Sequence, residues 1–70
     1  MENKSNIVQR LHLCLLATRI GKDVTDLSYV KYDDGEEYVT IKVKGGWQKA
    51  VNVTGDSGAA LILDVVKALL

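Results

Sequence analysis

The sequence predicts an α+β fold, a three-stranded antiparallel meander with two helices on one face, in the order α-β-β-β-α. Apolar residues recur at helical spacing near both ends of the chain, whereas the middle is rich in aromatic and β-branched residues. Two turn signals, Asp34-Gly35 and Gly45-Gly46, divide this middle into three strands. Because the helices and the sheet each have an apolar side to bury, they are expected to pack as a two-layer sandwich.

The length of the chain limits how the fold can be stabilised. Its 70 residues are expected to form a single domain over residues 6–70, after a flexible N-terminus over residues 1–5. A domain of this size buries only about 60% of the surface of its unfolded chain, and it usually needs a disulfide, a metal or a second subunit. Cys14 is the only cysteine and His12 the only histidine, which excludes an intrachain disulfide and an ordinary zinc site. Oligomerisation remains, and Cys14 is expected to be a small buried hydrophobe.

The first helix is expected from about Asn6 to Ile20, with Ser5 or Asn6 as its N-cap and Gly21 as its stop. Successive side chains lie about 100° apart around a helix, so its apolar residues form two stripes. One stripe consists of Ile7, Val8, Leu11, Cys14 and Leu15, and the other of Leu13, Leu16, Ala17 and Ile20. The core can cover one stripe, and the other is then an exposed apolar patch of the kind that marks an interface.

The three strands are expected over Leu27–Asp33, Tyr38–Val43 and Trp47–Val53. The register of the second hairpin depends on the length of its loop. A two-residue loop would place the valines of the third strand on the polar face of the sheet, whereas a three-residue loop keeps them on the apolar face. We therefore expect the three-residue loop, in which Val39 pairs with Val51 and Ile41 pairs with Lys49 on the core-facing side. Gly46 is then expected at the left-handed position of the turn.

The last helix is expected to begin near Ser57, with Asp56 or Thr54 as its N-cap, and to run to the end of the sequence. After its first turn only two residues are charged, Asp64 and Lys67. The apolar residues therefore cover an arc of about 200°, roughly twice the width of a stripe that faces a core. The helix carries more apolar surface than one sheet face can cover.

This apolar surplus predicts a homodimer. The centre of the arc, Ile62, Val66 and Leu69, is expected to face the sheet. This leaves either Leu61 and Val65 on one flank, or Leu63 and Leu70 on the other, for a partner. The expected interface combines these flanks with the second stripe of the first helix, and its residues are Leu61, Val65, Leu63, Leu70, Leu13, Leu16 and Ile20. Alternatively, the last helix is wedged between the sheet and the first helix, with no second chain.

The α-β-β-β-α order and the alanine-containing helix from Ala59-Ala60 to Ala68-Leu69 resemble the double-stranded-RNA-binding domain. That family contacts phosphates with a lysine cluster at the start of its final helix. The matching stretch here, residues 56–60, has an acid and no lysine. The chain has nine basic and nine acidic residues and no net charge, so it has no general attraction for nucleic acid. The resemblance therefore predicts the topology, and RNA binding is not expected.

An alternative function uses the second hairpin as a basic, aromatic patch for single-stranded nucleic acid. The residues of this patch would be Lys42, Lys44, Lys49 and Trp47. The commoner role of such lysines is to keep sheet edges from pairing with other chains. We prefer that role, with the tryptophan packed in the core or against the hairpin.

No nucleophile and base stand at a spacing that indicates catalysis, and His12 is expected at a surface or an interface. Four acidic residues bracket the first turn without the spacing of an EF-hand, and we expect them at a solvated hairpin tip: Asp33, Asp34, Glu36 and Glu37. Asp56 is expected to cap the last helix and so to keep an anion away from Gly55–Gly58. We therefore expect no enzymatic activity, no cofactor and no metal.

After the aromatic Trp47, the chain reads Val51-Asn52-Val53, Asp56-Ser57, Ala60 and Ile62-x-Asp64-Val65-x-x-Ala68-Leu69. This pattern covers about a third of the chain and resembles small uncharacterised proteins carried on bacterial prophages and integrative elements. The resemblance implies a source on such an element and no established activity. Our leading hypothesis is an accessory or regulatory protein of a mobile element, and a host or phage protein is a further candidate partner. Inhibition of a host defence protein is a further alternative.

The first residues match neither a signal peptide nor a membrane span. An unpaired cysteine fits a reducing compartment. We therefore expect a cytoplasmic protein.

Overall fold

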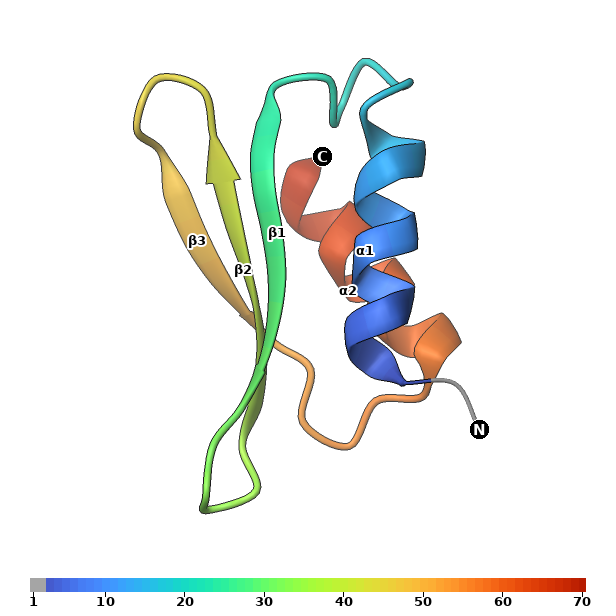
Figure 1. Cartoon of the computed structure of the whole chain (residues 1–70), viewed down its shortest axis with the longest axis vertical. Helices are drawn as coiled ribbons and strands as arrows, with labels where there is room; N and C mark the ends of the chain where they lie inside the picture. Colours follow the sequence, from blue (N-terminus) through green and yellow to red (C-terminus); the bar gives the residue numbers. More distant parts are fainter. Residues whose placement is uncertain (1–2) are drawn as a thin grey trace.

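The computed structural model describes residues 3–70 and has the predicted order of elements (Figure 1). The elements are α1 (Lys4–Leu15), β1 (Val24–Lys31), β2 (Glu37–Val43), β3 (Gln48–Asn52) and α2 (Gly58–Leu69). The strands form one antiparallel sheet in the order β1-β2-β3, and both helices lie on the same side of it (Figure 1). The predicted α+β fold is confirmed.

Helix α1 begins earlier and ends earlier than expected. Its N-cap is Asn3, whose side chain accepts a hydrogen bond from the backbone N–H of Ser5 at 2.8 Å. Residues 4 and 5 are therefore helical, which corrects the expected start of the helix near Asn6, while Met1 and Glu2 lie outside the described residues. The helix ends at Leu15 rather than Ile20, because the hydroxyl of Thr18 donates to the Leu15 carbonyl oxygen at 2.7 Å and the chain turns there.

Gly21 does not stop the helix but allows the returning chain to pass close to it. A Cβ atom at Gly21 would lie 2.5 Å from the Cβ atom of Leu15. The carbonyl oxygen of Gly21 then accepts from the backbone N–H of Val24 at 3.1 Å, where β1 begins. This close approach brings residues 24–26, which lie before the expected start of the strand at Leu27, into the sheet.

The second hairpin has the predicted three-residue loop. Val39 pairs with Val51 and Ile41 pairs with Lys49, as expected. The backbone N–H of Val43 donates to the Trp47 carbonyl oxygen at 2.9 Å, and Gly46 has a φ of 93°. The register predicted from the face pattern is therefore confirmed, although β3 itself is shorter than expected.

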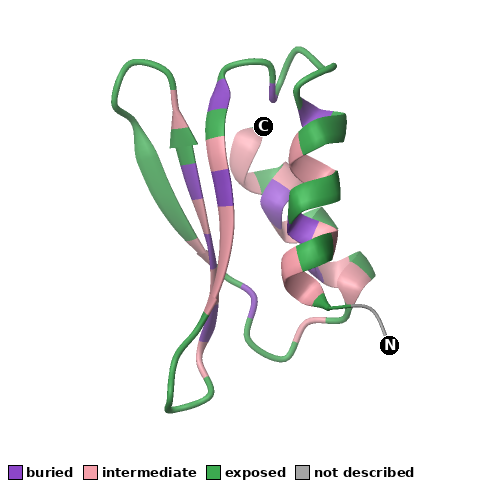
Figure 2. Cartoon of the chain, viewed as in Figure 1, coloured by how far each residue is buried: buried purple, intermediate pink, exposed green. Residues whose placement is uncertain are grey.

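The core lies between the sheet and the two helices (Figure 2). Its buried residues are Val8, Leu15, Val24, Leu27, Val39, Ile41, Val53, Leu61 and Val65. On α2 the prediction holds only for Leu69, which packs against the core. The buried residues are Leu61 and Val65, whereas Ile62 and Val66 are not among the residues packed against the core. The error came from placing the core opposite Asp64. That residue is half-buried and lies beside β3, not on the outer side of the helix.

The N-cap of α2 is Ser57, whose hydroxyl accepts from the Ala60 N–H at 3.2 Å. This corrects the expected caps, Asp56 and Thr54. The hydroxyl of Thr54 instead accepts from the Glu37 N–H at 2.9 Å. Within residues 3–70, neither helix has the length and apolar character needed to cross a membrane.

Candidate functional site

An apolar groove runs between the two helices. It has a volume of about 230 Å³ and is lined by Ile7, Arg10, Leu11 and Cys14 of α1 and by Ile62 of α2. The helices approach closely at its end, where a Cβ atom at Gly58 would lie 2.9 Å from Ile7 Cδ1. Cys14 is exposed at this groove, which corrects its expected burial.

The apolar surface continues from the groove around the outer side of α2. Ile62 and Val66 are four residues apart and therefore neighbours on the helix, as are Val66 and Leu70. Leu63 is 59% exposed and Leu70 is 82% exposed. We refer to the set as the helical face: Ile7, Leu11 and Cys14 of α1, and Ile62, Leu63, Val66 and Leu70 of α2.

The expected interface residues are distributed over four places. Leu63 and Leu70 lie on the helical face, but Leu61 and Val65 are fully buried in the chain's own core and offer no surface to a partner. Residues Leu13 and Leu16 are exposed and line hollows beside β1, while Ile20 lies beyond the end of α1. The expected combination into one patch is therefore wrong.

The lysine-rich hairpin does not form one patch either. Lys42 and Trp47 line a shallow hollow of about 280 Å³. Lys49 lines a second hollow beside α2, and Lys44 lines a third beside β1. The tryptophan is 49% exposed instead of packed in the core. The geometry therefore gives no support to the nucleic-acid alternative.

Glu37 forms a buried polar cluster that the sequence analysis missed. It is only 8% exposed, and its Oε2 accepts from Lys4 Nζ at 2.7 Å and from the Tyr29 hydroxyl. Its Oε1 accepts from the Gly55 backbone N–H at 3.2 Å. The ammonium of Lys4, followed by the hydroxyl of Tyr29, lowers the pKa of Glu37 to about 2.

Tyr29 responds in the opposite direction, since its hydroxyl bonds to the carboxylate of Glu37 and its pKa rises to about 12. The expectation of a solvated carboxylate at position 37 is therefore wrong. One signal in the sequence indicates this burial. Side chains two residues apart in a strand lie on the same face, so Glu37 shares the core-facing side with Val39 and Ile41.

The other acidic residues of the first turn remain near solvent. Asp33 and Asp34 are exposed, and the carboxylate of Glu36 accepts from the Thr54 hydroxyl at 3.1 Å. Among residues 3–70, no group of three or more potential ligands converges to hold a metal ion.

Asp56 does not cap α2 as expected. Its Oδ2 is buried and has no hydrogen-bond donor among the described residues. The pKa of Asp56 is raised, first by a hydrogen bond shared with the Asp64 carboxyl group and then by burial and the charge of Asp64. Two carboxyl groups can share a hydrogen bond only when one of them holds a proton, which favours the protonated form.

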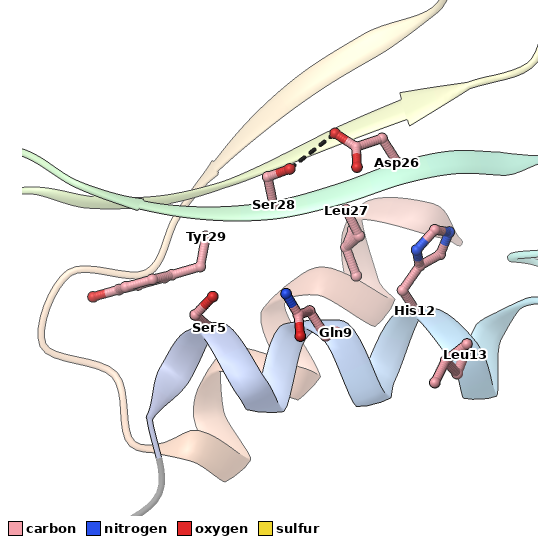
Figure 3. A pocket seen from close by; sticks show the side chains of 8 residues that line it. All are labelled: Ser5, Gln9, His12, Leu13, Asp26, Leu27, Ser28 and Tyr29. Atoms are coloured by element: carbon pink, nitrogen blue, oxygen red, sulfur yellow. Dashed lines mark hydrogen bonds between the residues drawn. The ribbon is translucent and has the colours of Figure 1, made fainter.

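A separate hollow, of about 380 Å³, lies between α1 and β1 (Figure 3). Residues Ser5, Gln9, His12 and Leu13 line it from α1, and Asp26, Leu27, Ser28 and Tyr29 line it from β1. The ring of His12 is held in place because its Nε2–H donates to the Val24 carbonyl oxygen at 2.9 Å. His12 thereby joins α1 to the start of β1.

Comparisons with known proteins add no relative. No family model, no curated protein and no solved structure matches this chain.

Proposed function

We propose that the protein is a small, non-enzymatic protein-interaction module that forms a homodimer through its helical face. The observation that carries this proposal is the exposure of Leu63 and Leu70 beside the apolar groove between α1 and α2. Contiguous exposed apolar surface of this kind is typical of protein interfaces.

A second copy is the partner that this face fits best. Around a two-fold axis a patch meets itself, so the exposed apolar side chains of the helical face would cover one another. A 70-residue chain without a disulfide also has a small core, and a second subunit would extend it. Self-association is therefore favoured over capture of a different protein.

The resemblance of the last third of the chain to prophage proteins supplies the biological setting. On that basis we propose an accessory or regulatory role in a mobile genetic element, in the cytoplasm. The non-enzymatic part rests on the sequence, in which no nucleophile and base stand at a spacing that indicates catalysis.

Sedimentation equilibrium of the wild-type chain, Leu63→Glu and Leu13→Glu tests the proposal. Leu13 is 70% exposed but lies beside β1, so it is a matched control for the same change off the helical face. We expect a wild-type dimer, a monomeric but folded Leu63→Glu variant and a dimeric Leu13→Glu variant. A wild-type monomer at every concentration, or equal dissociation of both variants, would refute the homodimer.

A further inference from the structure

The hollow between α1 and β1 lies against an open sheet edge. Strand β1 is an outer strand, because the sheet order is β1-β2-β3. The Tyr32 N–H donates to the Glu36 carbonyl oxygen at 2.8 Å, and this bond determines which residues of β1 have backbone groups that point toward β2. In an antiparallel pair the bonding residues recur at every second position. Val30 and Ser28 therefore bond to β2, and the backbone groups of Tyr29 and Leu27 point away from it.

The other side of the sheet confirms this phase. The Val53 N–H donates to the Glu37 carbonyl oxygen at 2.9 Å, so the odd-numbered residues of β2 bond to β3 and the even-numbered ones to β1. Among residues 3–70, the backbone N–H and C=O groups of Leu27 and Tyr29 have no partner. Both residues line the hollow.

We propose that the hollow between α1 and β1 (the β1 groove) binds an extended peptide segment of a partner protein, which adds to β1 as a fourth strand. Figure 3 shows Leu27 and Tyr29 directed toward α1, and Asp26 and Ser28 directed to the other side of β1. An added strand would alternate in the same way. Apolar side chains on one of its faces would enter the hollow beside Gln9. Its main chain would bond to Leu27 and Tyr29, as in other cases of strand addition.

Charge selects the opposite face of the added strand. Among residues 3–70, no lysine or arginine lines the β1 groove, and Asp26 supplies its only carboxylate. The Ser28 hydroxyl donates to Asp26 Oδ2 at 2.8 Å, which holds that carboxylate on the side of β1 away from α1. Its register partner on β2 is Lys42, and no ion pair joins the two among the described residues. Opposite charges on neighbouring strands attract. The bound segment is therefore expected to carry a lysine or arginine between two apolar residues.

The edge of β3 is less suitable for the same interaction. β3 has five residues against eight in β1, and it carries Lys49 on its core-facing side. Short edge strands and inward-pointing lysines are common protections against added strands. β1 has no lysine before its last residue, Lys31. The two edges therefore differ in length and in the lysine that β3 carries on its core-facing side.

A second copy of this chain fits the groove less well than a lone segment. Joining two β1 edges would bring two α1 helices over strands only about 4.8 Å apart, whereas packed helices lie about 8–10 Å apart. A lone extended segment brings no helix. The groove and the helical face involve different residues of α1, so the two proposals can be tested separately.

The test uses the full chain and two fluorescein-labelled heptapeptides, Val-Thr-Val-Lys-Val-Thr-Val and the same peptide with glutamate in place of lysine. Fluorescence anisotropy measures binding, and amide hydrogen exchange followed by NMR locates it. We expect the lysine peptide to bind at least about tenfold more tightly, since tenfold corresponds to about 1.4 kcal/mol. Its binding should slow exchange at Leu27 and Tyr29 and leave Ala50 on the β3 edge unchanged.

Two variants sharpen this test. Asp26→Asn should remove the preference for lysine while retaining binding, and Leu13→Glu should weaken both peptides. Leu63→Glu, on the helical face, should leave peptide binding unchanged. Any of three results would overturn the proposal: no binding of either peptide at millimolar concentration, protection at β3 instead of β1, or protection of Leu27 and Tyr29 that rises with protein concentration without peptide. The last result would assign the edge to a second copy.

Discussion

Lys4 Nζ and Glu37 Oε2 lie 2.7 Å apart and join the first turn of α1 to the first residue of β2. The same carboxylate accepts from Tyr29 of β1 and from the loop before α2. One largely buried group therefore connects both layers of the fold. Removal of one member of such a buried set leaves the others without partners, which is more damaging than the pair itself is stabilising.

We expect this cluster to make stability fall in acid. The pKa of Glu37 is lowered from 4.5 to about 2 in the folded chain. Its contribution is therefore complete above about pH 4.5 and is lost as the pH falls toward 2. Urea unfolding at pH 7, 4 and 2.5 checks this, with Glu37→Gln as the comparison. The variant should be less stable than the wild type at pH 7, and the difference should shrink in acid. A difference independent of pH would contradict this assignment.

Asp56 is expected to make stability fall as the pH rises, opposite to the effect of Glu37. The pKa of Asp56 is raised by its shared hydrogen bond with Asp64, so its contribution is complete below its unfolded pKa and is lost as the pH rises through the folded value. Asp56→Asn should therefore raise the melting temperature at pH 7 and change it less at pH 3. Ser57→Ala is the matched control, because loss of the real N-cap should cost about 1 kcal/mol at both pH values. A lower melting temperature for Asp56→Asn at pH 7 would show that Asp56 supports the helix.

Substitution of two leucines of α2 should show which side of the helix faces the core. Leu61 is fully buried and Leu63 is largely exposed. Leu61→Ala is expected to lower the free energy of unfolding by about 2–5 kcal/mol. Leu63→Ala should change it by no more than about 0.5 kcal/mol in dilute protein. Denaturation at fixed protein concentration measures both changes, and equal losses would place the wrong side of α2 against the sheet.

Gly21 should not tolerate a side chain. An added Cβ atom would approach both the Cβ atom and the carbonyl oxygen of Leu15, at 2.5 and 2.6 Å, and the expected loss of stability is about 1–3 kcal/mol. At Gly58 the nearest atom is the flexible Ile7 Cδ1, so Gly58→Ala should stay within about 0.5 kcal/mol of the wild type. Thermal unfolding of both variants is the check. A neutral Gly21→Ala variant would mean that the turn after α1 can move away from the helix.

The order of elements and the register of the second hairpin could be predicted because both follow from local pattern. The valines at 39 and 51 share a face only when the loop has three residues, so the sequence allows a single satisfactory pairing. The stop of α1 could not be predicted in the same way. Residues 16–20 retain helical spacing, and the stop depends on the Thr18 hydroxyl and on the packing of Gly21 against Leu15.

The orientation of α2 could not be predicted from the sequence either. A helix that is apolar around most of its surface has no single side that its pattern assigns to the core. The choice of Leu61 over Ile62 is made by tertiary packing, in which α1 lies on one side of α2 and β3 on the other. For the same reason, the groove at the β1 edge could not be predicted, because it is formed by residues of α1 and β1 that are far apart in the chain.

The Lys4–Glu37 pair also bears on the rates of folding. The two residues are 33 positions apart in the chain, and contacts that close long loops form slowly compared with the short hairpins of the sheet. The pair is therefore expected to form after the main folding barrier has been crossed. Its loss should accelerate unfolding and leave the folding rate nearly unchanged. The cluster at Glu37 would then determine how long each folded molecule lasts, while the two hairpins determine how quickly it forms.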